Sequence, residues 1–76
     1  MMQLSSLAPG EQGRVTFISA EGDMRRRLID IGLIENTEVS CLGRSPLGDP
    51  SAYLIRGAVI ALRDSDADTV FIEREG

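Results

Sequence analysis

The chain has 76 residues, of which 42% are apolar and 26% are charged, and its formal net charge is -4. A chain of this length builds one small core and leaves no room for a deep catalytic cleft, and its composition is that of a folded protein. The net charge is negative and every basic residue is an arginine, so the chain has no lysines with which to build a broad positive surface. We therefore expect no nucleic-acid partner.

The N-terminal part of the chain predicts a turn followed by a strand. Residues 4–10 form an entry segment that ends in the Pro9-Gly10 turn. Residues 12–18 then alternate as a strand does, and we expect Val15 and Phe17 to lie on one face of it.

After residue 20 the apolar period changes to that of a short amphipathic helix. Apolar residues now recur at i, i+4 and i+7, namely Met24, Leu28 and Ile31. Gly32 follows where a left-handed C-cap ends a helix, and Leu33 is placed to fold back onto the apolar stripe. The helix is therefore predicted to stop sharply at the glycine.

A second strand and a loop follow the helix. Asn36 tolerates a positive φ and predicts a turn, and residues 37–42 alternate with Val39 and Cys41 facing inward. Residues 43–51 contain two glycines and two prolines. Because each proline fixes its own φ and restricts the preceding residue, we expect this loop to have a defined shape.

The C-terminal third predicts further strands around one helical turn. Residues 53–56 and 58–63 are strand-like, and Gly57 between them is either a bulge or tight corner in one bent strand or a hinge between two strands. Residues 64–68 predict one helical turn. The aspartates near its start are expected to accept hydrogen bonds from the free backbone N–H groups of that turn. Residues 70–73 predict the last strand.

These elements predict a mainly β single domain over residues 1–76. About five short strands with such short connections cannot form parallel βαβ units, so a small antiparallel barrel is the economical solution. We expect an SH3-like barrel with one short amphipathic helix after the first strand and a helical turn before the last. An OB-like barrel is the alternative, because strand count does not separate the two.

The residue types favour a binding module over an enzyme. The chain has no histidine and one cysteine, so it lacks the usual nucleophile and base pairs and the soft ligands of iron or zinc. We therefore expect no catalytic residue, no cofactor and no metal site. The lone Cys41 is expected in the core, in a protein of a reducing compartment, the cytoplasm. The longest purely apolar run, residues 58–62, is too short for a membrane helix, and the N-terminus lacks the features of a signal peptide.

Two motifs invite sharper hypotheses. Asp64-x-Asp66-x-Asp68, with Glu75 at the last position, has the spacing of a calcium loop, but Thr69 stands where that loop needs glycine and strands flank it. We interpret it as a capped turn. Arginines 25–27 are consecutive on the helix, so their guanidinium groups point apart, which disfavours a phosphate site. A solvated surface or pairing within the domain, for which acidic residues stand nearby, and contact with a partner both remain open for them.

Several motifs in this order resemble the FeoA family, ferrous iron transport protein A. They are Leu4-x-x-Leu7-x-Pro9-Gly10-x-x-Gly13-x-Val15, Arg25-x-Arg27-Leu28-x-x-Ile31-Gly32-Leu33, Pro46-Leu47-Gly48-Asp49-Pro50 and Arg56-Gly57-x-x-Ile60-Ala61-Leu62-Arg63. The resemblance covers roughly residues 4–73. Glu35-Asn36 stands where the family usually has Pro-Gly, and asparagine can replace the glycine of a left-handed turn.

The resemblance implies a cytosolic SH3-like accessory protein of the FeoB membrane transporter. Such a protein is expected to dock on the cytosolic side of FeoB, to be recruited to the inner face of the membrane in this way, and to modulate assembly or the nucleotide cycle of the transporter. The alternative is a self-associating or regulatory module of the kind appended to iron-dependent repressors. A weak homo-oligomer is compatible with either.

The candidate contact residues lie on the proline-bounded loop and at the helix. A loop of fixed shape loses little entropy on binding, although a plain hairpin corner uses the same residue types. The candidates are Arg25, Arg26, Leu33, Ser45, Pro46, Leu47, Gly48, Asp49 and Pro50. Gly10, Gly32, Asn36 and Gly57 are expected to act as structural turns.

Overall fold

The computed structural model describes residues 1–74, and its strands form one antiparallel sheet in the order β1-β6-β2-β3-β4-β5. The strands are β1 (Met2–Gln3), β2 (Gln12–Ile18), β3 (Glu38–Arg44), β4 (Ser51–Ile55), β5 (Ala58–Leu62) and β6 (Val70–Arg74). The helical elements are η1 (Leu4–Ser6), α1 (Gly22–Asp30) and α2 (Asp64–Ala67). The predicted helix after the first long strand and the predicted helical turn before the last strand are both confirmed.

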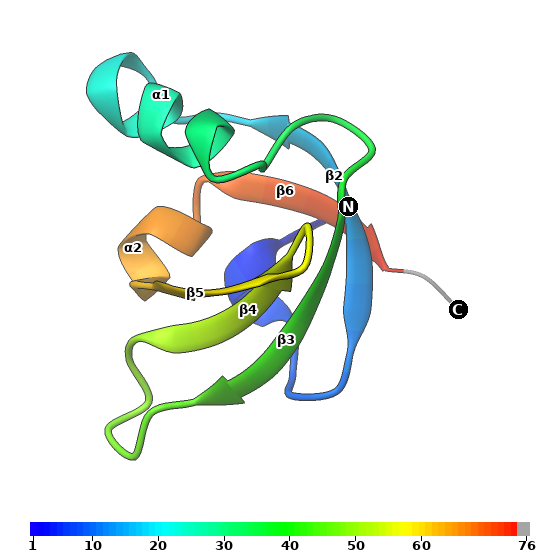
Figure 1. The fold of residues 1–76 in the computed structure, drawn as a ribbon, viewed down its shortest axis with the longest axis vertical. Helices are drawn as coiled ribbons and strands as arrows, with labels where there is room; N and C mark the ends of the chain where they lie inside the picture. Colours follow the sequence, from blue (N-terminus) through cyan, green and yellow to red (C-terminus); the bar gives the residue numbers. More distant parts are fainter. Residues whose placement is uncertain (75–76) are drawn as a thin grey trace.

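The sheet curves around one apolar interior, and Figure 1 shows η1 and α2 beside the β4–β5 hairpin with α1 at one end of the molecule. The core side chains come from every part of the chain, with Leu4, Leu7, Leu28, Leu33, Val39, Tyr53, Ile55 and Ile72 among the largest fully buried ones. Cys41 is buried here as a free thiol, as predicted. The entry segment, residues 4–10, also contributes side chains to the core, since Leu4 and Leu7 are both fully buried. β1 was not predicted, because a two-residue strand has no alternating pattern.

The prediction that Phe17 shares the buried face of Val15 is wrong. The pairing of β2 with β6 shifts register between these two residues, so that two steps along β2 match one step along β6. Such a bulge reverses the alternation of side chains beyond it. Phe17 is consequently 46% exposed, and its ring stacks on that of Phe71 with the centroids 4.6 Å apart.

The helix cap is confirmed in atomic detail. Gly32 has φ +111°, its N–H donates to the carbonyl of Ile29, and the N–H of Leu33 donates to the carbonyl of Leu28 at 3.1 Å. These two bonds are the pair that defines a Schellman cap. Leu33 thereby turns back into the core, where it joins Leu28.

The other predicted turns also form. Gly10 and Asn36 have positive φ values of 91° and 74°. Arg56 and Gly57 have φ values of 51° and 83° and together form the two-residue connection between the antiparallel strands β4 and β5. A turn with two positive φ angles is the usual tight hairpin connection. Gly57 therefore belongs to a hairpin turn between two strands.

Candidate docking loop and its supporting polar network

The loop between β3 and β4, residues 45–50, is closed by two of its own backbone hydrogen bonds. The N–H of Gly48 donates to the carbonyl of Ser45 at 2.8 Å, and the N–H of Ser45 donates to the carbonyl of Pro50 at 3.0 Å. Gly48 has φ +87°, which a glycine adopts at little cost. The loop thus has the defined shape that its prolines predicted.

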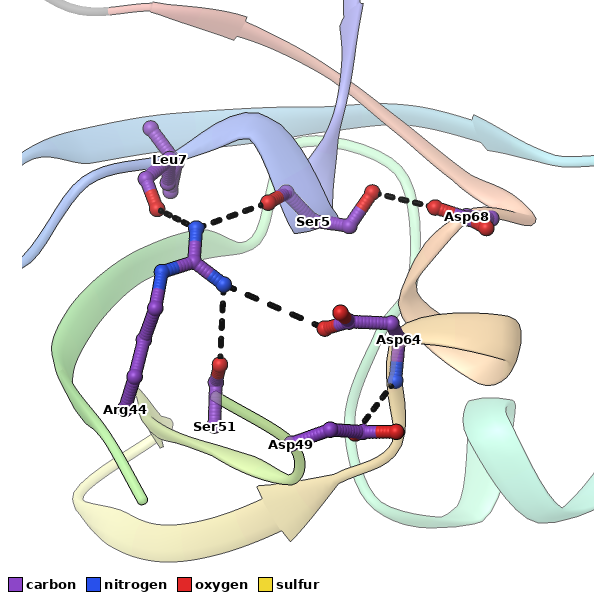
Figure 2. A network of polar contacts seen from close by, with 7 residues as sticks. All are labelled: Ser5, Leu7, Arg44, Asp49, Ser51, Asp64 and Asp68. Carbon is purple, nitrogen blue, oxygen red and sulfur yellow. Dashed lines mark hydrogen bonds and ion pairs between the residues drawn. The ribbon is translucent and has the colours of Figure 1, made fainter. Parts of the chain in front are cut away.

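Arg44, the last residue of β3, connects the base of this loop to the rest of the domain (Figure 2). Its guanidinium group donates to the carbonyls of Ser5 and Leu7 at 3.0 and 3.1 Å and to the hydroxyl of Ser51 at 3.2 Å. A carboxylate oxygen of Asp64 lies 3.9 Å away. The planar guanidinium presents five N–H donors, and here they serve three separate segments. No local sequence pattern could indicate this role, because the accepting carbonyls lie 37 and 39 residues earlier in the chain.

Asp49 fixes the loop to α2. Its carboxylate accepts from the backbone N–H of Asp64, the first residue of α2, at 2.9 Å. The expectation that the aspartates of α2 cap their own helix is wrong at its first position, since the residue in the N-cap place is Arg63, which makes no side-chain cap bond. The cap comes from the loop instead, because the loop passes beside the start of α2 (Figure 2).

Removing this cap should lower stability by about 1 kcal/mol, the usual cost of losing an N-cap acceptor. We expect Asp49→Ala to melt about 4–8 °C below the parent in a circular dichroism scan, as a domain of this size does for each kcal/mol. Asp49→Asn keeps a side-chain oxygen and should recover most of the loss. Equal losses for both variants would show that the charge matters here and the accepted hydrogen bond does not.

Tyr53 lies in the core close to this network. Its side chain is fully buried, and among the described residues no hydrogen bond of normal geometry reaches its hydroxyl. Burial raises the pKa of Tyr53 above its ordinary value of 10.0, and the nearby Ser51 hydroxyl offsets part of that rise. The neutral phenol is therefore the form that the fold accommodates.

The raised pKa of Tyr53 predicts a loss of stability in alkaline solution. Above about pH 10 the unfolded chain releases the phenol proton before the folded chain does, so the unfolded state binds fewer protons and the free energy of unfolding falls as pH rises. Urea titrations from neutral pH to beyond pH 10 should show this fall in the parent. Tyr53→Phe should show a shallower fall, and equal slopes in the two proteins would contradict the buried-phenol explanation.

The candidate contact residues do not all lie together. Leu47 at the loop tip is 94% exposed, and Pro46 and Pro50 are also exposed. The hydroxyl oxygen of Ser45, in contrast, is buried, and Asp49 uses its carboxylate within the domain. In Figure 1 the loop is at the opposite end of the molecule from α1. The tip of the loop is therefore separated from the helix, but Pro50 at the base of the loop lines one groove together with Asp30 and Ile31 at the end of α1.

The helix candidates need correction. Leu33 is fully buried, so its side chain cannot reach a partner. Two of the arginines are bonded within the domain, to partners outside the helix. Arg25 donates to the carbonyl of Ile18 at 2.9 Å, and Arg27 pairs with Asp66 at 2.8 Å. Arg26 is exposed and has no hydrogen bond or ion pair within residues 1–74, which leaves its contact with a partner a prediction.

Two further features of the described residues bear on metals and membranes. No group of three or more His, Cys, Asp and Glu side chains is arranged there to hold a metal ion. Two carboxylates of the calcium-like motif make contacts within the domain, since Asp66 forms an ion pair with Arg27 and Asp68 accepts a hydrogen bond from the hydroxyl of Ser5. Glu75, the last position of that motif, lies outside the described residues. Within the same part of the chain no helix has the length and apolar character needed to cross a bilayer.

Comparison with known proteins gives consistent results. The model of the FeoA domain family matches residues 2–74. The Fe(2+) transport protein A/Fe(2+) transporter FeoB fusion protein of Porphyromonas gingivalis is 29% identical over 72 residues, which are 95% of this chain and 8% of that protein. The chain thus spans a small part of that relative.

Solved structures are similar over nearly the whole chain. The solution structure of FeoA from Chlorobium tepidum is 33% identical, with a TM-score of 0.92 over 99% of this chain and 71% of that one. The crystal structure of Stenotrophomonas maltophilia FeoA complexed with zinc, described as a prokaryotic SH3 domain protein, is 27% identical, with a TM-score of 0.85 over 96% of this chain and 91% of that one. The predicted SH3-like fold is confirmed, and the OB-like alternative is set aside.

Proposed function

The chain belongs to the FeoA family, and on that premise we propose that it is a non-catalytic accessory protein of ferrous iron uptake that docks on the cytosolic side of a FeoB-type transporter. Docking would place this cytoplasmic protein at the inner face of the membrane and modulate assembly or the nucleotide cycle of the transporter. The fusion protein of Porphyromonas gingivalis supports this partner, since its name joins the two parts in one chain.

The single observation that carries the proposal is the 94% exposure of Leu47 on a loop of fixed shape. A leucine held almost fully in water gains nothing from the fold, whereas burial of such a side chain against a partner contributes about 1.5–3 kcal/mol. The bonds of Arg44 and Asp49 hold the loop in place before binding, so little conformational entropy is lost on contact. The transporter contact is therefore assigned to this loop.

An apolar sheet face extends the loop surface. Leu42, Leu54 and Val59 are exposed on the outer face of β3, β4 and β5, where Leu54 pairs with Val59 across the sheet. Neighbouring exposed apolar side chains mark contact surfaces more often than scattered ones do. We assign this face to the same contact as Leu47, with the loop tip as its anchor.

The test is a calorimetric titration of the chain against the isolated cytosolic region of the FeoB protein from the same organism. Three titrations, with GDP, with a GTP analogue and without nucleotide, separate docking from its place in the nucleotide cycle. Saturable binding in any of them supports the proposal. Absence of heat and of binding in all three overturns it, and sedimentation at several concentrations then tests the alternative, a self-associating module.

A further inference from the structure

One long edge of the sheet is left without protection. The described strands end at β1 and at β5, and β1 is only two residues long. β5 is five residues long, with the sequence Ala-Val-Ile-Ala-Leu. Natural proteins usually protect a free edge with charged residues, proline, a bulge or a short length. β5 has none of these within its own residues.

The hairpin register shows which backbone groups of β5 are free. Ala58 pairs with Ile55 next to the two-residue turn, so these residues exchange both backbone hydrogen bonds, and Ile60 pairs with Tyr53 in the same way. The N–H and C=O groups of Val59 and Ala61 consequently point away from β4. No hydrogen bond from another described residue reaches them. The two N–H groups and two C=O groups of Val59 and Ala61 thus have the spacing needed to pair with an added antiparallel strand.

A groove runs along this edge, between β5 and α1. Its volume is about 830 Å³, and its apolar lining includes Met24 and Ile31 from α1 and Ile60 and Leu62 from β5. Arg27 and Asp66 also line the groove, but they pair with each other at 2.8 Å. A strand added to β5 would therefore place alternate side chains against an apolar wall.

The charges at the two ends of the edge indicate what such a strand carries. Arg56 lies two residues before β5 and Arg63 one residue after it, and neither guanidinium has a hydrogen bond or ion pair within the part of the chain that the structure describes. Asp30 lies across the groove on α1. Arg63 lines the groove itself, whereas Arg56 lies beyond the other end of β5, in a separate pocket that Glu35 and Glu38 also line. An arginine without an ion pair among the described residues therefore stands at each end of an uncharged edge.

We propose that β5 is a peptide-binding edge that accepts an extended segment of another protein as an added antiparallel strand. The segment has apolar side chains at the alternate positions that face the groove and an acidic residue at each end. Main-chain hydrogen bonds to Val59 and Ala61 provide affinity, and pairing with Arg56 and Arg63 selects the acidic ends. This inference uses the edge of the sheet, not its outer face, and it does not depend on docking to the transporter.

A synthetic peptide tests the proposal directly. The probe is acetyl-Glu-Val-Thr-Ile-Thr-Val-Thr-Glu-amide, whose third and fifth residues lie opposite Ala61 and Val59 and whose terminal glutamates lie opposite Arg63 and Arg56. In nuclear magnetic resonance titrations of the full chain, we expect the largest amide shifts along β5, with slowed hydrogen exchange of the Val59 and Ala61 amides. No binding at millimolar peptide, or shifts confined to another surface, would overturn the proposal.

Backbone-modified peptides supply matched controls. Methylation of the third and fifth peptide nitrogens removes the two donors that face β5 and should weaken binding about tenfold or more. Methylation of the fourth nitrogen, which faces away, should leave binding within about twofold of the unmodified peptide, as expected for a group that makes no such bond. Equal affinities for the two methylated peptides would exclude strand addition even if the peptide binds.

Protein variants test the same edge from the other side. Arg63→Glu should weaken binding of the peptide with glutamate ends and strengthen binding of a peptide with lysine ends. Val59→Pro removes one free edge N–H without breaking the β4 ladder and should weaken binding, whereas Val59→Thr retains the N–H and should bind as the parent does. Because the methylated peptides need no change in the protein, the proposal stays testable if Val59→Pro fails to fold.

Discussion

Replacing Leu47 with aspartate should abolish detectable binding to the cytosolic region of FeoB while leaving the melting temperature unchanged. The side chain is 94% exposed and packs against no core, so the folded state loses nothing when it is removed. In a partner's pocket, however, a buried carboxylate without a counter-charge is strongly disfavoured, and loss of a central apolar anchor costs about 2 kcal/mol or more, roughly thirtyfold in affinity. Calorimetric titration of parent and variant measures this difference.

Two controls separate the loop contact from a general charge effect. Leu47→Met keeps an apolar side chain of similar volume and should bind nearly as the parent does. Gln12→Glu adds one negative charge on β2, away from the loop tip, and should leave binding unaffected. Leu47→Asp binding as tightly as the parent would remove the loop from the contact surface.

Substituting Gly32 with valine should unfold the domain or come close to doing so. Gly32 has φ +111°, a conformation that β-branched residues essentially never adopt, and a Cβ added there would lie 2.6 Å from the Cδ atom of Arg56. Strain, the lost Schellman cap and displacement of Leu33 from the core together should cost at least about 3 kcal/mol. The whole stability of a domain of this size is on the order of 5 kcal/mol.

Thermal and urea melts measure this effect, and the chain provides a matched control. Gly43 in β3 has an ordinary φ, and a Cβ added there meets no described atom within 4 Å, so Gly43→Val should be tolerated. We expect the Gly32 variant to melt more than about 12 °C below the parent, if it folds at all. If Gly32→Val melts within a few degrees of the Gly43 variant, the cap does not have the role assigned to it.

The local features of this fold could be predicted from the sequence because their causes are local. The apolar period of α1, the glycine that ends it and the asparagine turn each depend on residues within a few positions of one another. The same holds for the alternation of Val39 and Cys41 in β3. The prolines likewise predicted a loop of defined shape, since they restrict the backbone wherever they stand.

The candidate site was predicted only in part. Leu47 could be chosen because an apolar residue between two prolines and a glycine has no neighbouring pattern to join. Arg25 and Leu33 were assigned to the same surface as the loop, but one donates to the carbonyl of Ile18 and the other is buried. The number of residues between the helix and the loop does not determine how far apart they lie in the folded domain.

What the sequence alone determined is therefore the kind and order of most elements, the family and the loop, because short-range backbone preferences and side-chain period decide these. The tertiary structure decided the rest. The hydrogen bonds of Arg44 to carbonyls of the N-terminal segment and the cap that Asp49 gives to α2 join residues 15 to 39 positions apart. The β2 bulge that exposes Phe17 depends on the register between β2 and β6. The free edge of β5 belongs with them, since a strand becomes an edge only when every other strand has found its neighbours.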